Sequence, residues 1–200
     1  AAWARRAVVL ISLGGGRRLQ AMWQVACELR RRDPSRLVQV APGLTPLPAA
    51  WTARFRQLGT DLVEPASFAS CLRDCAVAVL AGGVSLYEAA ALGTPTVALA
   101  IVRGQRPTVL AFQRAGLTCD GGRLLAGRTR TSARRVARLV DRLLGEPARR
   151  QAMSRAGRRC VDGRGAQRVA AIVRRALAAR HADGVGAVLP PVVLSPPRRH

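Results

Sequence analysis

Two glycine-rich segments have the residue types and the spacing to hold a phosphate group. They are Gly14-Gly15-Gly16, which two arginines follow, and Gly82-Gly83-Val84-Ser85. Each stands where an apolar run ends and a helical pattern begins. Glycine lets the backbone approach a phosphate closely, and the first N–H groups of the following helix point toward it with the positive end of the helix dipole. The Ser85 hydroxyl can cap that helix and also donate to a phosphate oxygen.

Neither segment matches two widespread phosphate-binding patterns. The dinucleotide pattern GxGxxG is absent, and the P-loop GxxxxGK[ST] needs a lysine, which the chain lacks altogether. Taken alone, Gly14-Gly15-Gly16 is equally well interpreted as a tight structural turn. The argument for a ligand therefore depends on what lies beside the glycines.

Glu88 adds a second kind of chemistry three residues after Ser85. A carboxylate can accept hydrogen bonds from both vicinal hydroxyls of a ribose, so Glu88 beside a phosphate-binding turn favours a nucleotide ligand. The alternative is a capping box, in which Glu88 bonds back to a helix start that Ser85 caps. Acidic residues number only 11 in 200, which makes this one a candidate binding residue.

The sequence offers no catalytic residue and no metal site. The cysteines form no CxxC pair and have no histidine partners, and no DxD pair of carboxylates is present. Both histidines, His181 and His200, lie in or beside the carboxy-terminal tail, so the folded body has no histidine base. We therefore predict neither a metal ion nor a cofactor. The cysteines are interpreted as free thiols in a reducing cytoplasm.

The net charge of +22 suggests nucleic-acid binding, but the composition weakens that interpretation. All 33 basic residues are arginine, lysine and asparagine are absent, and a very GC-rich coding sequence would produce the same bias. We expect a largely solvated basic surface without a specific nucleic-acid site. Such a surface attracts phosphate-bearing substrates and, peripherally, anionic membranes. No apolar run is long enough to span a bilayer.

The pattern around these residues predicts a Rossmann-like, doubly wound parallel α/β sheet. Strands are expected at 7–13, 37–40, 61–63, 76–81 and 95–101, alternating with helices at 19–32, 49–58, 68–73, 85–92 and 105–115. Strand and helix alternating at this pace indicate βαβ units with right-handed crossovers. Three further helices are expected at 133–144, 148–160 and 165–179. We predict one domain over residues 1–180 and a flexible tail over 181–200 that contains proline and arginine.

The segment from Leu80 to Thr96, LAGGVSLYEAAALGTPT, followed by Gln105-Arg106-Pro107, resembles the carboxy-terminal domain of GT-B enzymes. Two further segments, Ile11–Gly16 and Asp162–Ala170, are similar to the hydrolases of pseudaminic acid biosynthesis, which cleave UDP from an amino-deoxy sugar. Related proteins include the spore-coat polysaccharide proteins and the peptidoglycan N-acetylglucosaminyltransferase. The resemblance covers roughly residues 6–179.

The resemblance implies a site for a UDP-sugar. Glu88 would bind the ribose, and the diphosphate would contact a run of four residues, Gly83, Val84, Ser85 and Leu86. The cleft that faces the sugar and the phosphates would be lined by Gly14, Gly15 and Gly16. Gln105 would reach the sugar or the β-phosphate, although a helix-initiating role before Pro107 is the alternative. Gly104 stands where the family often has Asn, so a sugar contact made by that Asn has no counterpart in this chain.

One function agrees best with these inferences, and three alternative functions stay open. We interpret the chain as the UDP-sugar-binding domain of a UDP-sugar hydrolase of the pseudaminic acid type. The alternatives are the donor-binding domain of a glycosyltransferase, an inactive orphan α/β domain and an Arg-rich nucleic-acid-binding module. In the related enzymes an N-terminal domain supplies the acceptor site and usually the catalytic base. The expected partners are therefore a UDP-sugar and such a domain, and this chain by itself would bind without turnover.

Overall fold

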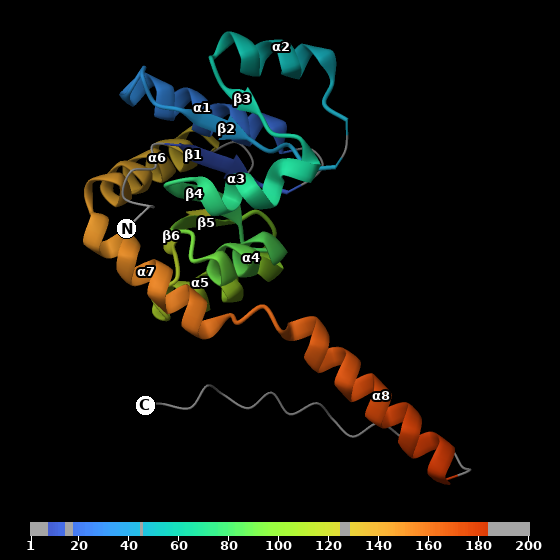
Figure 1. Cartoon of the computed structure of the whole chain (residues 1–200). Helices are drawn as coiled ribbons and strands as arrows, with labels where there is room; N and C mark the ends of the chain where they lie inside the picture. The colour runs from blue at the N-terminus through green and yellow to red at the C-terminus, as the bar shows by residue number, and fades with distance from the viewer. Residues whose placement is uncertain (1–7, 15–17, 45, 125–128, 184–200) are drawn as a thin grey trace.

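Six parallel strands form one sheet within residues 8–14, 18–44, 46–124 and 129–183, the part of the chain that the computed structural model describes (Figure 1). The strands are β1 (Val9–Ser12), β2 (Val38–Val40), β3 (Asp61–Leu62), β4 (Val77–Ala81), β5 (Thr96–Ala100) and β6 (Cys119–Arg123). Their order is β3-β2-β1-β4-β5-β6, so the direction of the crossovers reverses between β1 and β4. The predicted Rossmann-like, doubly wound sheet is confirmed.

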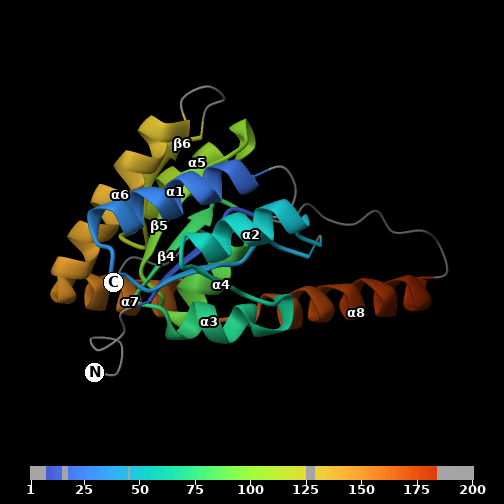
Figure 2. The same cartoon turned by 90° about the horizontal axis from the view of Figure 1, so that it is seen from above.

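Helices cover both faces of the sheet (Figure 1, Figure 2). One face carries α1 (Leu19–Arg32), α2 (Ala49–Gln57) and α6 (Thr129–Gly145). The other carries α3 (Phe68–Asp74), α4 (Val84–Leu92) and α5 (Arg106–Arg114), with the short 3-10 turns η2 (Pro65–Ser67) and η3 (Arg103–Gln105) before α3 and α5. α7 (Pro147–Cys160) packs against α4 and α6, and α8 (Gly165–Asp183) follows it.

The central strands divide the core into two halves by simple alternation. Ile11 and Val79 belong to the cluster under α1, α2 and α6, whereas their neighbours Leu10 and Leu80 belong to the cluster under α3 and α4. Every residue of β1, β4 and β5 is buried. A parallel sheet that is covered on both faces needs apolar side chains at consecutive positions, which explains the near-continuous apolar runs of the sequence.

The structure contains one strand that the sequence pattern did not predict. β6 has the sequence CDGGR, which lacks the apolar run expected of a buried strand. It lies at the edge of the sheet, where only Cys119 and Gly121 are buried. β6 pairs in parallel with β5, and this pairing stabilises the strand more than the low β propensity of its own residues does. The predicted helices are present, with ends that differ by a few residues.

The carboxy-terminal helices differ in how they relate to the body. α7 crosses α4 at Gly157, where an added Cβ would lie 2.6 Å from the carbonyl oxygen of Ala90. α8 instead extends away from the body (Figure 1, Figure 2) and exposes a stripe of aliphatic side chains: Val169, Ile172, Val173 and Leu177. It continues to Asp183, past the predicted domain end at residue 180, and the rest of the predicted tail lies outside the described residues. No described helix is long and apolar enough to cross a membrane.

Candidate functional site

The two glycine-rich turns meet because β1 and β4 are neighbours in the sheet. Ser12 pairs with Leu80 in parallel register, so the turns that follow both strands emerge at the same edge. This is also the point where the crossovers reverse direction, and in open α/β sheets ligands bind in the crevice at that point. Gly14 has a φ of +80°, the left-handed region that glycine adopts without strain. Gly15 and Gly16 lie outside the described residues.

A cavity of about 310 Å³ occupies this crevice. Gly14 from the first turn and Ser85 from the second both line it. The remaining wall comes from residues at the carboxyl ends of β1, β2 and β3 and the start of α3, namely Ser12, Ala41, Gly43, Leu44, Val63, Pro65 and Phe68. The structure therefore brings two of the predicted site residues together, and adds a mostly apolar wall that the sequence pattern did not single out.

The start of α4 lies beside this cavity, which Ser85 lines. The helix begins at Val84 with Gly83 as its N-cap, and no side chain caps it. The backbone N–H groups of Val84 and Ser85 are the first of the helix and have no intrahelical acceptor. The N–H of Leu86 donates to the carbonyl of Gly83 at 3.1 Å, and the Leu86 side chain is fully buried in the core. Val84, at 75% exposure, points into solvent.

Two expectations about this helix start are wrong. Ser85 does not cap α4, because the helix begins one residue earlier and Ser85 is already inside it. The capping-box interpretation of Glu88 fails with it, since no side-chain cap bond is formed. Glu88 is exposed one turn further along the helix, on the same side as Ser85. Among the described residues no hydrogen bond or ion pair engages its carboxylate, and its role toward a ribose stays a prediction.

Gln105 lies directly behind the Gly82-Gly83 turn. An added Cβ at Gly82 would lie 3.2 Å from both the Cβ and the carbonyl oxygen of Gln105, and one at Gly83 would lie 3.6 Å from its Nε2. The Oε1 of Gln105 accepts a hydrogen bond from the N–H of Ile101 at 3.0 Å. Gln105 is the N-cap of α5, but its side chain does not cap the helix. The amide is thus held by the loop after β5, with its Nε2 facing the turn.

An ion pair fixes the position of α5 and of Gln105 with it. Arg106 donates to the carboxylate of Asp120 on β6 at 2.6 Å, and the N–H of Gly122 donates to the same carboxylate oxygen at 2.8 Å. Burial raises the pKa of Asp120, but these two hydrogen bonds and the charges of Arg106 and Arg135 together lower it by more, so the pKa lies below its ordinary value. The carboxylate is therefore charged at neutral pH, and it ties the first turn of α5 to the edge strand.

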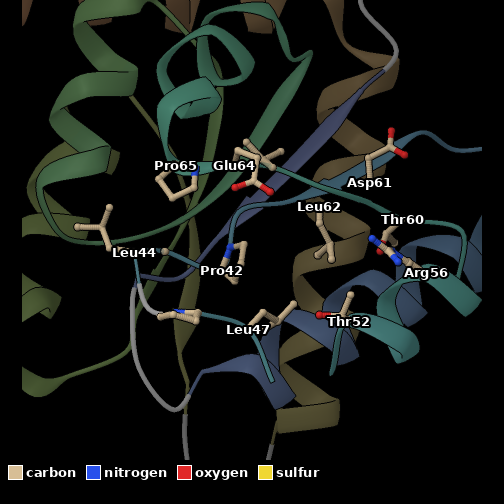
Figure 3. Close-up of a pocket in the computed structure, with 13 residues that line it drawn as sticks. Pro42, Leu44, Leu47, Thr52, Arg56, Thr60, Asp61, Leu62, Glu64 and Pro65 are labelled. Carbon is tan, nitrogen blue, oxygen red and sulfur yellow. The ribbon is translucent and has the colours of Figure 1, made fainter. Parts of the chain in front are cut away.

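A second, larger cavity of about 650 Å³ adjoins the first (Figure 3). The two share four lining residues: Gly43, Leu44, Val63 and Pro65. Figure 3 shows Pro42 from the end of β2 across from Glu64 and Pro65, which follow β3. Arg56 and Thr52 from α2 close the far side. The sequence pattern predicted no element between the strand at 37–40 and the helix at 49–58, because loop residues that form a cavity wall have no periodicity.

The described residues contain no group of three or more His, Cys, Asp or Glu that could hold a metal ion. All five cysteines are free thiols. The predictions that no metal, cofactor or catalytic residue is supplied by this chain stay predictions.

Several proteins of known structure share this fold. No family model matches the chain. CalG4, the calicheamicin glycosyltransferase, superposes with a TM-score of 0.62 at 22% identity over 90% of this chain and 45% of that one. A UDP-GlcNAc 2-epimerase from Neisseria meningitidis bound to UDP-GlcNAc superposes with a TM-score of 0.55 at 17% identity, over 78% of this chain and 43% of that one. The fold is that of one half of GT-B enzymes, as the resemblance implied.

A relative with clear sequence identity points to a narrower group of proteins. The spore coat polysaccharide biosynthesis protein SpsG of Bacillus subtilis (strain 168) is 32% identical over 108 residues, which account for 53% of this chain and 30% of that protein. The resemblance to the spore-coat polysaccharide proteins is thus confirmed. This chain spans less than half the length of each of these three proteins.

Proposed function

We propose that the chain is the donor-binding half of a GT-B-type glycosyltransferase of polysaccharide biosynthesis, and that it holds a UDP-sugar. One observation carries the proposal: Gly14 and Ser85 line a single cavity at the point where the crossovers of the sheet reverse. Glycosyltransferases among the structural neighbours favour the transferase, and several neighbours were solved with UDP or a UDP-sugar. The sequence relative acts in spore-coat polysaccharide biosynthesis, which supports the same setting.

Each predicted residue has a role that its place in the structure allows. The free N–H groups of Val84 and Ser85, with the Ser85 hydroxyl, would donate to the diphosphate at the positive end of α4. Glu88, exposed on the same side of that helix, would accept from the ribose hydroxyls. The Nε2 of Gln105, which faces Gly83, would donate to the sugar or the β-phosphate. Leu86 would contribute only through its backbone, because its side chain is buried.

The apolar wall of the cavity suits the flat face of a base. Ala41, Val63 and Phe68 come from the ends of β2 and β3 and from α3, and they lie on the side of the crevice away from Gln105. Ligand sites typically combine such apolar walls with a few placed polar groups. A nucleoside lying against this wall would direct its phosphates toward the start of α4. The base, the phosphates and the sugar would then lie along the crevice in this order.

A second domain would complete the enzyme. The chain covers 30% of its sequence relative and 43–45% of the two structural neighbours above, so the full enzymes are longer than this unit. The domain that we predicted over residues 1–180 would bind the UDP-sugar donor. An N-terminal domain would supply the acceptor site and the catalytic base. Large apolar side chains exposed near the crevice, Leu44, Val84 and Val102, suit a surface that such a domain covers. The free cysteines support a reducing compartment, and we propose that the enzyme acts in the cytoplasm.

A hydrolase of the pseudaminic acid type is the second candidate. It is favoured by the segments Ile11–Gly16 and Asp162–Ala170, which resemble that group more than the transferases. Both enzymes would bind the donor in the same crevice and differ in what attacks it, water or an acceptor hydroxyl. Analysis of the products formed from a UDP-amino-deoxy sugar by this chain joined to its N-terminal domain would separate them: release of the free sugar without any acceptor supports the hydrolase.

Titration calorimetry with UDP tests the site. We expect wild type to bind UDP with a Kd below about 1 mM. Glu88→Ala should weaken binding by roughly 10- to 100-fold, the range for hydrogen bonds to a charged group. Ser85→Ala should weaken it by a similar factor, roughly 10- to 100-fold, because its hydroxyl would donate to the charged diphosphate.

Asp74→Asn is the matched control. Asp74 is also an exposed carboxylate, but it ends α3 at the amino edge of the sheet, away from the crevice. Its removal makes the same change in net charge and should leave the affinity for UDP within about twofold. No detectable binding by wild type, or equal losses in Glu88→Ala and Asp74→Asn, would show that the site assignment is wrong.

A further inference from the structure

A third cavity, of about 610 Å³, lies at the open edge of the sheet. It is bounded by the end of α5, the beginning of β6, and one face each of α6 and α7. Gln113, Gly116 and Thr118 place it at the amino end of β6, whereas the crevice described above lies at the carboxyl ends of β1 to β4. The two cavities share no lining residue, so a ligand here would not be the proposed nucleotide-sugar.

Four arginines from two helices line this cavity: Arg135 and Arg142 on α6, and Arg149 and Arg159 on α7. Arg135 and Arg142 are seven residues apart, about two helical turns, so they lie along one side of α6, while Arg149 and Arg159 both line the cavity from α7. Between them stand Leu139 and Met153, which give the cavity an apolar wall. Charges beside a low-dielectric wall act more strongly on an anion than the same charges in open water.

The negative groups nearby leave most of this charge uncompensated. Asp120 is the one acidic residue lining the cavity, and its carboxylate is engaged by Arg106, which is not part of the lining. Glu146 pairs with Arg149 at 3.1 Å. Burial raises the pKa of the Cys119 thiol, so this sulfur, which accepts from Arg149 at 3.4 Å, is neutral at pH 7.

Two of the arginines are held in place and two are available. Arg149 is anchored by Glu146 and the Cys119 sulfur, and Arg135 donates to the carbonyl of Asp120 at 3.2 Å. Arg142 and Arg159 have no hydrogen bond or ion pair with any described residue. Because Arg142 and Arg159 line the same cavity as the anchored Arg149, the three guanidinium groups can donate to one ligand there.

We propose that this cavity is a second anion site, which binds a phosphate or pyrophosphate group through Arg142, Arg149 and Arg159. The planar guanidinium matches phosphate oxygens with two parallel hydrogen bonds, and the cavity volume is in the range of small-ligand sites. The phosphate could be carried by a soluble molecule or by a lipid headgroup. Both sources offer the same chemistry to the three arginines.

Binding of pyrophosphate to wild type and to the double variant Arg142→Gln/Arg159→Gln tests the proposal. We expect the double variant to bind pyrophosphate at least about tenfold more weakly, because two charge-assisted contacts are lost. Its affinity for UDP should change by less than about twofold, since the crevice is untouched. The second readout separates this site from the nucleotide site, at which pyrophosphate could also bind.

The control keeps the net charge and the helices the same. Arg138 and Arg155 are exposed residues on α6 and α7 that do not line the cavity. Arg138→Gln/Arg155→Gln should bind pyrophosphate like wild type, to within about twofold. Equal loss in both double variants would mean that the general basic field attracts the anion, and the proposal would be overturned. It would be overturned equally by full binding in Arg142→Gln/Arg159→Gln.

Vesicles distinguish the two sources of phosphate. The same three proteins are sedimented with phosphatidylcholine vesicles that contain or lack phosphatidic acid. Binding to the acidic vesicles that is lost only in Arg142→Gln/Arg159→Gln assigns the site to a lipid headgroup. Binding of pyrophosphate with no sedimentation assigns it to a soluble ligand. Failure of wild type to bind either probe would refute the site.

Discussion

Replacing Gly82 by alanine should destabilise the whole domain, because α5 packs directly on that glycine. The added Cβ would lie 2.6 Å from Cγ2 of Val109 and 3.2 Å from both Cβ and the carbonyl oxygen of Gln105. The first distance is roughly 1 Å inside the optimum carbon–carbon separation of about 3.5–4.0 Å. Val109 is fully buried in the core, so its side chain cannot turn into solvent. Relief requires α5 to move away from the turn.

The expected cost follows from that movement. Inserting a methyl group into a packed core typically costs about 1–3 kcal/mol. For a chain of this size each kcal/mol lowers the melting temperature by about 2–4 °C, which gives a decrease of roughly 2–12 °C. Urea unfolding measures the free energy, and a thermal scan measures the midpoint. UDP affinity should decrease as well, since Gln105 would move with α5.

Gly83→Ala is the matched variant that separates packing from binding. Its nearest neighbour is Nε2 of Gln105 at 3.6 Å, an ordinary contact, and the backbone is extended with φ −106°. Stability should stay within about 0.5 kcal/mol of wild type. UDP affinity should decrease, because the methyl group would stand where the backbone approaches the diphosphate. An unchanged midpoint for Gly82→Ala, or an equal loss of stability in Gly83→Ala, would refute this reasoning.

Two further predictions concern how the elements are held together. Gly157→Ala should lower the free energy of unfolding by about 1–3 kcal/mol, because its Cβ would meet the backbone oxygen of Ala90 at 2.6 Å; Gly145→Ala, with no atom within 4 Å, should be nearly neutral in the same urea titration. Asp120→Asn should cost about 1–3 kcal/mol at pH 7, since Arg106 loses its charged partner. The folded pKa of Asp120 is depressed, so its contribution is present above the unfolded pKa of about 3.9 and lost as the pH falls through the lower folded value. Urea titrations between pH 3 and pH 7 should therefore show a shallower acid-side decline for the variant than for wild type, and parallel curves would contradict the argument.

The sequence by itself determined the fold class and the end of one helix. Consecutive apolar residues, as in 76–81, are typical of a strand that is buried on both faces, and the regular alternation of such runs with helices predicts a parallel α/β sheet. The helix predicted at 85–92 ends where Gly93 follows it, and Gly93 adopts the left-handed conformation that glycine permits, with a φ of +71°. Such features depend on neighbours along the chain.

The tertiary structure decided the features that depend on contacts between strands distant in sequence. β6 carries no apolar pattern, and only pairing with β5 makes it a strand. The cavity wall from Ala41 and Val63 exists because β2 and β3 end at the same edge as β1. Ser85 carries an ordinary capping signature, but the helix starts one residue earlier, so Ser85 lies inside the helix and lines the crevice. A motif in sequence names candidate donors, whereas strand order and packing decide which of them point at a common ligand.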